Sequence, residues 1–166
     1  MEISRDQIKI FTIVVGGLVL ASYVWGVSRL SQPSDLWGGV TGNLQRFSVI
    51  FMFVAAIGYL VYWWIALFQM EGGDVANLRW PWGESDNKGT NRLLLSFAIF
   101  LIPSALWIES TGLHLRNPND FTPFLVVGTL LLASIGNVML GLLAFSAYQD
   151  DVPRASWLLF GAFALS

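Results

Sequence analysis

The sequence predicts an all-α transmembrane helical bundle, and three observations predict it. Apolar residues make up 55% of the 166-residue chain and charged residues only 12%, which is about half the charge of a soluble domain. No stretch alternates apolar and polar residues with the period of two that a membrane barrel strand needs. Charge is absent from five windows, which are 10–28, 47–70, 93–108, 121–149 and 155–166. We therefore expect one transmembrane domain over residues 1–166, with four full spans and a fifth short or truncated apolar helix.

The first two windows each predict a span, because crossing a hydrocarbon layer of about 30 Å takes roughly 20 apolar residues in a helix. The first span is expected at about 10–28. Its apolar stretch exceeds that of a signal peptide and no small-residue cleavage site follows, so we expect it to be retained. The second span, at about 47–69, is apolar on every helical face. It ends in an aromatic cluster typical of a headgroup boundary, made of Tyr59, Tyr62, Trp63 and Trp64.

The third and fourth spans are expected at about 93–113 and 121–148. Pro103 should kink the third span, and the Ser104 hydroxyl or a neighbouring helix can compensate for the missing backbone donor. Asp120 is predicted to cap the fourth span, with Pro123 in its first turn, where proline is tolerated.

The fifth window, 155–166, supplies 12 residues, or about 18 Å of helix. Two explanations stay open. It is a short re-entrant or interfacial helix, or it is the start of a fifth span that continues in a longer chain. We favour the second.

The sidedness of the bundle follows from counting Lys and Arg in the loops. Six lie on the side of the amino terminus and three on the opposite side. This places the amino terminus in the cytoplasm or the equivalent compartment. The first group is Arg5, Lys9, Arg79, Lys88, Arg92 and Arg154, and the second is Arg29, Arg46 and Arg116.

Glu109 is the one ionisable residue inside a predicted span, and such a residue is a functional hypothesis by default. Glu109 and Asn137 are therefore the candidate ligand or ion residues. Counted from residue 93, Glu109 lies roughly 24 Å along the helix, within about 6 Å of the hydrocarbon boundary. This depth favours the alternative, an interfacial carboxylate that pairs with an arginine: Arg116, Arg29 or Arg46.

Small residues recur at spacings of four on two spans and predict helix packing, because they let another helix approach closely. Gly17 and Ala21 form such a pair on the first span. The fourth span carries a partly polar stripe whose asparagine can hydrogen-bond across a contact: Thr129, Ala133, Asn137 and Gly141.

The loop 71–91 contains a candidate interface or docking segment formed by Arg79, Trp80 and Trp82. Trp and Arg are frequent hot spots of protein interfaces. The alternative, which we favour, is that the two tryptophans lie at the membrane surface as part of an aromatic belt.

Catalytic chemistry finds little support. The chain has no cysteine and one histidine, His114, so no metal site and no catalytic residue are assigned, and a solvated loop position is expected for His114. There is no phosphate loop or metal-binding histidine motif. The net charge of −2 without a basic run argues against nucleic acid as a partner. No cofactor can be inferred, and the expected partners are the lipid bilayer and other membrane protein chains or a second copy.

Three functions are compatible with these features. The first is a non-catalytic helical subunit of a larger membrane assembly, which the small-residue stripes and the lack of buried polar chemistry favour. The second is a bundle that binds a hydrophobic small molecule or lipid. The third is a channel or proton-coupled carrier that uses Glu109, although one acid and one asparagine provide little polar lining.

The second function draws on a resemblance. Five helices with eight tryptophans in 166 residues are similar in size and composition to the tryptophan-rich sensory protein family, and the resemblance implies binding of porphyrins or sterols. That family has its Trp- and Pro-rich segment between the first two helices. Here the Trp80-Pro81-Trp82 segment falls between spans two and three, so the resemblance assigns no site residue.

Overall fold

The computed structural model describes residues 3–30 and 32–166, and this part of the chain forms helices and no strands. The long helices are α1 (Arg5–Ser28), α2 (Gly42–Trp64), α4 (Gly89–Arg116) and α5 (Thr122–Gln149). The short elements are the 3₁₀ turn η1 (Pro33–Trp37), the π-helical turn η2 (Ile65–Gln69), α3 (Gly72–Ala76) and α6 (Ala155–Leu165). Helix α2 continues directly into η2.

Four of these helices are long and apolar enough to cross a membrane: α1, α2 together with η2, α4 and α5. Helix α6 is apolar but has only 11 residues. The predicted all-α bundle of membrane type, with four full spans and a short fifth helix, is confirmed. These spans make the chain an integral membrane protein.

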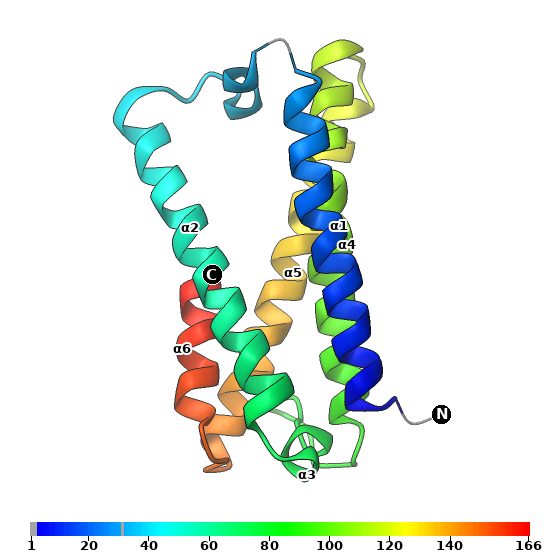
Figure 1. The fold of residues 1–166 in the computed structure, drawn as a ribbon, viewed down its shortest axis with the longest axis vertical. Coiled ribbons are helices and arrows are strands. Elements are labelled where there is room, and N and C mark those ends of the chain that lie inside the picture. Colours follow the sequence, from blue (N-terminus) through cyan, green and yellow to red (C-terminus); the bar gives the residue numbers. More distant parts are fainter. Residues whose placement is uncertain (1–2, 31) are drawn as a thin grey trace.

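Helix α5 lies between the α1–α4 pair and the α2–α6 pair (Figure 1). Helices α1 and α5 pack along α4, and α6 packs against both α5 and α2. Helix α3 lies at one end of the bundle, beside the first residues of α1, and η1 lies at the other. We refer to these as the α3 end and the η1 end. Helix α2 leans away from α1, α4 and α5 towards the η1 end, and α6 runs beside only the half of α2 nearest α3.

Local hydrogen bonds explain where two of the long helices begin. The Ser4 hydroxyl accepts from the Gln7 amide while the Gln7 side chain accepts from the Ser4 amide, a reciprocal cap for α1. At the start of α5, the side-chain oxygen of Asn119 accepts from the amides of Phe121 and Thr122, at 2.9 and 3.1 Å. The predicted cap by Asp120 was therefore wrong, since the cap position is Phe121 and the side chain that accepts from these first amides is that of Asn119.

Pro103 is buried inside a continuous α4, which runs from Gly89 to Arg116. The Ser104 hydroxyl donates to the Phe100 carbonyl at 2.6 Å. The proline affects a different carbonyl. A residue at position 103 with an N–H would donate to the carbonyl of Ile99, four residues earlier, and Pro103 lacks this donor. The predicted compensation by Ser104 was thus wrong in its target, and α5 covers the Ile99 peptide instead.

Glycines mark the close contacts between helices. A Cβ on Gly136 of α5 would lie 2.7 Å from backbone atoms of Ile99 and Phe100 on α4, and one on Gly58 of α2 would lie 2.5 Å from the Leu165 nitrogen of α6. Real Cβ atoms essentially never come this close, so only glycine fits. Gly26 of α1 against Ile108, and Gly161 of α6 against Tyr62, follow the same rule.

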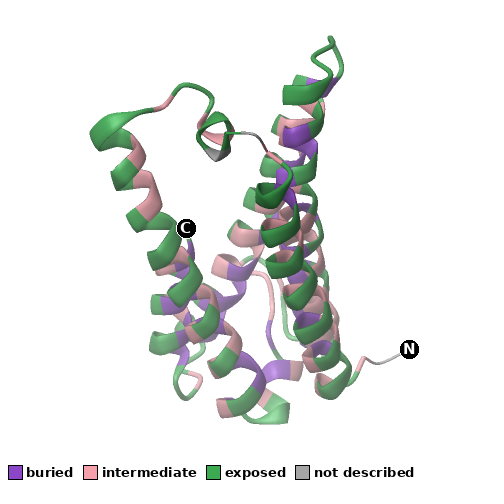
Figure 2. Ribbon diagram, turned by 45° about the horizontal axis from the view of Figure 1, so that its top comes forward, coloured by how far each residue is buried: buried purple, intermediate pink, exposed green. Residues whose placement is uncertain are grey.

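The core lies towards the α3 end, where α2, α4, α5 and α6 meet, and Figure 2 shows most residues of the outer helical faces as exposed. Tyr62 is fully buried there, with its ring edge-on to Phe97 at 6.0 Å and its hydroxyl donating to the Leu140 carbonyl at 3.0 Å. Tyr62 was predicted to belong to an aromatic cluster at the headgroup boundary, but its side chain is buried in the protein core and presents no surface to a headgroup. Trp63 bonds the Thr12 hydroxyl on α1, and Trp64 is half exposed.

Two arginines hold the end of η2. Arg5 of α1 donates to the Met70 carbonyl, and Arg154, immediately before α6, donates to the Gln69 carbonyl. The last carbonyls of a helix have no partner within the helix and carry a partial negative charge. A cation from α1 and one from the turn before α6 therefore fix the point where α2 turns into α3.

Candidate functional site

The most elaborate polar structure lies at the α3 end, in a region that we call the cap: residues 71–92 and 150–154. Arg79 is its first clamp. The guanidinium binds both carboxylate oxygens of Asp150, with N···O distances of 2.8 and 2.6 Å, and also donates to the Gly83 carbonyl at 3.0 Å. The Ser146 hydroxyl donates to the carbonyl of Arg79. The loop is thereby tied to the last turn of α5.

Arg92, in the first turns of α4, is the second clamp. Its guanidinium binds the two carboxylate oxygens of Asp86 at 2.7 and 2.8 Å and donates to the Leu78 carbonyl at 3.0 Å. Gly89 lets α4 start directly on α3, since a Cβ there would lie 2.6 Å from the Leu78 nitrogen. Bidentate pairs of this kind fix orientation as well as charge.

The clamps shift the titration of their carboxyl groups. The hydrogen bond from Arg79 holds the pKa of Asp150 below its ordinary value, and the hydrogen bond from Arg92 does the same for the pKa of Asp86. The Asp150 carboxylate in turn raises the pKa of Arg79. Both carboxylates are therefore ionised at neutral pH, and both clamps are in place.

This pKa pattern predicts loss of stability in acid. A carboxyl group with a lowered folded-state pKa stabilises the fold above its unfolded pKa of about 4, and this contribution disappears as pH falls through the lower folded value. We expect a constant thermal midpoint from pH 7 to about 5 and a fall below about 4. Calorimetry of Asp150→Asn should show a lower midpoint at pH 7 and a smaller fall in acid. Asp120→Asn, at the η1 end, should match wild type, and an acid fall of equal size in Asp150→Asn would contradict the assignment.

The predicted docking segment splits into an inner and an outer part. The Arg79 side chain points inward to its clamp, and Trp80 is half-buried against the core. Trp82 stacks on Trp80, with ring centroids 6.3 Å apart and an interplanar angle of 14°, and remains 75% exposed. The three residues are together, as their spacing implied, and only Trp82 is presented to the outside.

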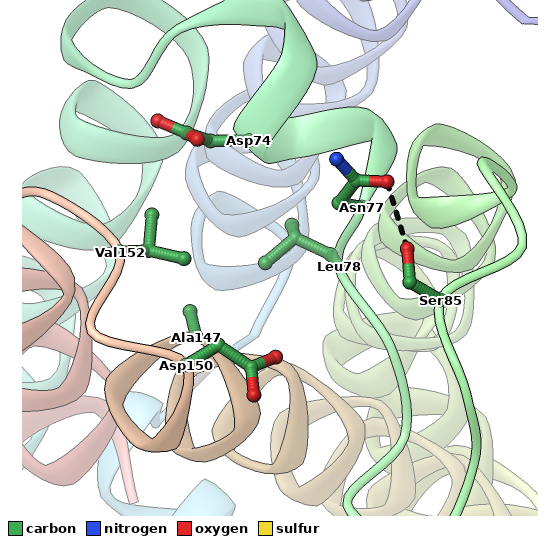
Figure 3. Close-up of a pocket in the computed structure, with 7 residues that line it drawn as sticks. All are labelled: Asp74, Asn77, Leu78, Ser85, Ala147, Asp150 and Val152. Atoms are coloured by element: carbon green, nitrogen blue, oxygen red, sulfur yellow. Dashed lines mark hydrogen bonds between the residues drawn. The ribbon is translucent and has the colours of Figure 1, made fainter.

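A cavity of about 320 Å³ opens beside this segment. Figure 3 shows apolar side chains around its middle and the carboxylates of Asp74 and Asp150 on opposite sides. Asn77 accepts a hydrogen bond from Ser85 at 2.7 Å on its rim. Within residues 3–30 and 32–166, the Asp74 carboxylate enters no hydrogen bond or ion pair. The lining is Asp74, Asn77, Leu78, Ser85, Ala147, Asp150 and Val152.

The sequence did not identify the carboxylates of this cavity. Asp74 and Asp150 lie 76 positions apart, and only the fold brings them to one cavity. The sequence offers only a weak indication of this site. Asp74 lies in the same polar loop as Arg79, and Asp150 lies in the polar segment that follows the fourth span.

Glu109 lies at the η1 end of α4, with its side chain half exposed. Its carboxylate accepts from Arg116 at 2.9 Å and lies 3.9 Å from the Arg29 guanidinium at the end of α1. Arg29 also lies over the ring of Trp25, 5.4 Å from its centroid. These are two of the three arginines considered as partners from the sequence. The assignment of Glu109 as a ligand or ion residue remains a prediction.

Asn137 faces α6 rather than Glu109. Its side-chain nitrogen donates to the Leu165 carbonyl at 3.1 Å, so it satisfies one of the last carbonyls of α6. Its side-chain oxygen is buried and has no hydrogen-bond partner among the residues that the structure describes. His114 lies in the last turn of α4, where its Nδ1 is 2.8 Å from the Thr122 hydroxyl. The prediction of a solvated loop position for this histidine was wrong.

Gly26, Gly58, Gly136 and Gly161 each lie in close contact with another helix of this chain. The glycines of the two predicted packing stripes do not. Gly17 and Ala21 are exposed on α1, and a Cβ on Gly17 or on Gly141 would meet nothing within 4 Å. Thr129 is buried, Ala133 is half-buried, and Asn137 reaches α6. As packing sites for another helix, these stripes remain predictions.

No family model matches this chain, and searches of curated proteins and of solved structures find no match either.

Proposed function

We propose that this chain is a non-catalytic helical subunit of a larger membrane assembly, in which helices of other chains pack against its outer faces. The observation that carries the proposal is the contrast between the glycines that are used and those that are open. A glycine permits the closest approach in three of the helix contacts: Gly26 for α1 with α4, Gly58 for α2 with α6, and Gly136 for α5 with α4. The Gly17–Ala21 face of α1 has the same character and no neighbour within the described chain.

The shape of α2 supports the proposal. Buried residues of α2 are confined to Gly58 and Tyr62, near its α3 end. The half nearer η1 leans away from the other helices, and large apolar side chains are exposed along it, including Phe47, Phe51 and Phe53. Association of helices within lipid depends on close packing and not on hydrophobic burial. An open small-residue face and a separated helix are the surfaces on which such packing can form.

Photo-cross-linking in native membranes tests the proposal. A photoreactive amino acid at position 17 is expected to form a discrete adduct with another protein chain, because a packed helix would lie against the small-residue face. The matched control is position 18, which is also exposed and lies at the same depth but about 100° around the helix. That position should give lipid adducts.

A second measurement uses the intact complex. Gly17→Leu is expected to reduce the protein that co-purifies in mild detergent, whereas Leu18→Ile should leave it unchanged. A chain that purifies alone as a stable monomer, with lipid adducts only at both positions, would contradict the proposal.

A further inference from the structure

Trp82 is a large apolar side chain held outward on a rigid turn. The turn is fixed by the Arg79 guanidinium, which donates to the Gly83 carbonyl at 3.0 Å while it binds Asp150. Stacking on Trp80 fixes the indole plane. Ordering a side chain and its loop is a major cost of association, and here the ordering precedes any contact. An exposed, pre-ordered tryptophan has the properties of a binding hot spot.

The cavity beside Arg79, lined by Leu78 and by Asp150, suits a long side chain with a cationic end. Leu78, Ala147 and Val152 provide an apolar surface along its middle, and Asp74 lies at one edge with no partner among the described residues. Lysine and arginine bury aliphatic stems on apolar surface while keeping their charge at a polar rim. A carboxylate at that rim supplies the charge-assisted hydrogen bond.

The charge of the cap selects between partners. The cap carries six carboxylates and four cationic side chains. Two carboxylates and two arginines pair with each other, as Arg79–Asp150 and Arg92–Asp86. Arg154 is directed to the Gln69 carbonyl. Over the part of the chain that the structure describes, the remaining carboxylates enter no ion pair; they are Glu71, Asp74, Glu84 and Asp151. Anionic lipid attracts Lys and Arg and repels such a surface.

We propose that the cap docks a basic segment of a partner protein, with Trp82 as the apolar anchor and the Asp74 cavity as the seat of one lysine or arginine side chain. This inference rests on the proposed function in one respect, which is that a partner protein carries the basic segment. Its test uses a peptide in place of the partner protein, and it probes the α3 end instead of the Gly17 face. The two proposals can therefore fail separately.

The test uses the full chain in nanodiscs of zwitterionic lipid and a fluorescent peptide of eight lysines interrupted by one phenylalanine. Fluorescence anisotropy should show saturable binding that weakens as salt is added. Asp74→Asn and Trp82→Ala should each weaken binding by about fivefold, the loss typical of an important interface residue. The matched controls at the η1 end are Asp120→Asn and Trp25→Ala, which should leave binding unchanged. Circular dichroism confirms that each variant keeps its helical content.

Three outcomes would overturn the proposal. They are the absence of peptide binding, binding that is insensitive to both cap variants, and location of Trp82 in lipid. To measure the last outcome, the emission of Trp82 is obtained by subtracting the fluorescence of Trp82→Phe from that of wild type. Brominated lipid in the nanodiscs quenches a tryptophan that lies in the lipid. Strong quenching of the Trp82 emission would therefore assign Trp82 to the membrane surface instead of a protein partner.

Discussion

Gly136→Ala is expected to lower the free energy of unfolding by about 3 kcal/mol, at the upper end of the usual cost of overpacking. The added Cβ would lie 2.7 Å from the carbonyl carbon of Ile99 and from the Cα of Phe100. Both are backbone atoms of α4, so no side-chain rotation can relieve the contact. Helices α4 and α5 would have to separate, and α4 is the helix against which α1 and α5 pack.

The position of this contact increases the expected loss. Pro103 removes the N–H that would otherwise bond the Ile99 carbonyl, so the α4 backbone is weakest at the peptide that Gly136 covers. Separation of α5 would expose that peptide in a medium without water, where an unsatisfied backbone group is costly.

Denaturation by SDS in mixed micelles, followed by circular dichroism, measures the change. Gly141→Ala is the matched control on the same helix, because its Cβ would meet nothing within 4 Å. Alanine is also the better helix former, so this control should be as stable as wild type or slightly more stable. Equal stability of the two variants would show that the Gly136 contact does not hold α4 and α5 together.

The positions of the spans could be predicted because the constraint on them is strong. A helix in hydrocarbon must be long and uncharged, and the charge-free windows record this directly. The helix ends were less predictable. Helix α4 runs from Gly89 to Arg116, beyond the predicted span of about 93–113, and the additional turns carry Arg92 and Arg116, which pair with Asp86 and Glu109.

The contacts between spans could not be predicted from the sequence, and Tyr62 shows why. A helix that is apolar on every face gives no signal of which face meets a neighbour. Tyr62 and the aromatic residues beside it therefore look alike in the sequence, although Tyr62 is fully buried and Trp64 is half exposed. The same ambiguity concealed Gly58 and Gly136 while drawing attention to Gly17 and Gly141.

The cap was only partly predictable for a different reason. The Arg-Trp-Pro-Trp segment was recognisable from residue type, since exposed tryptophan beside arginine is typical of interfaces. The partner of Arg79 lies 71 residues away at the end of α5, and no local spacing encodes that pairing. Asp74 became a candidate only when the fold placed it across a cavity from Asp150.

Tyr62→Ala is expected to be as damaging as any substitution in the core, with a loss of about 3–5 kcal/mol. Tyr62 joins three helices at one point, since it lies on α2, packs edge-on against Phe97 of α4 and donates to the Leu140 carbonyl of α5. Truncation removes the ring and leaves a cavity whose lining loses its dispersion contacts, and this cost applies inside a membrane as well as in water. Tyr62→Phe keeps the ring and loses one hydrogen bond, at about 1 kcal/mol.

The consequence should be largest for the placement of α2, because the half of α2 nearer η1 lies apart from the other helices and Tyr62 provides its buried link to α4 and α5. The chain has no cysteine, so spin labels can be placed at Leu60→Cys on α2 and Leu106→Cys on α4, both exposed positions. Electron paramagnetic resonance should give a narrow distance distribution in wild type and in Tyr62→Phe, and a broad one in Tyr62→Ala. If Tyr62→Ala kept the narrow distribution and nearly the stability of Tyr62→Phe, the glycine contacts of α2 with α6 would suffice to position α2, and the buried tyrosine would not be its main attachment.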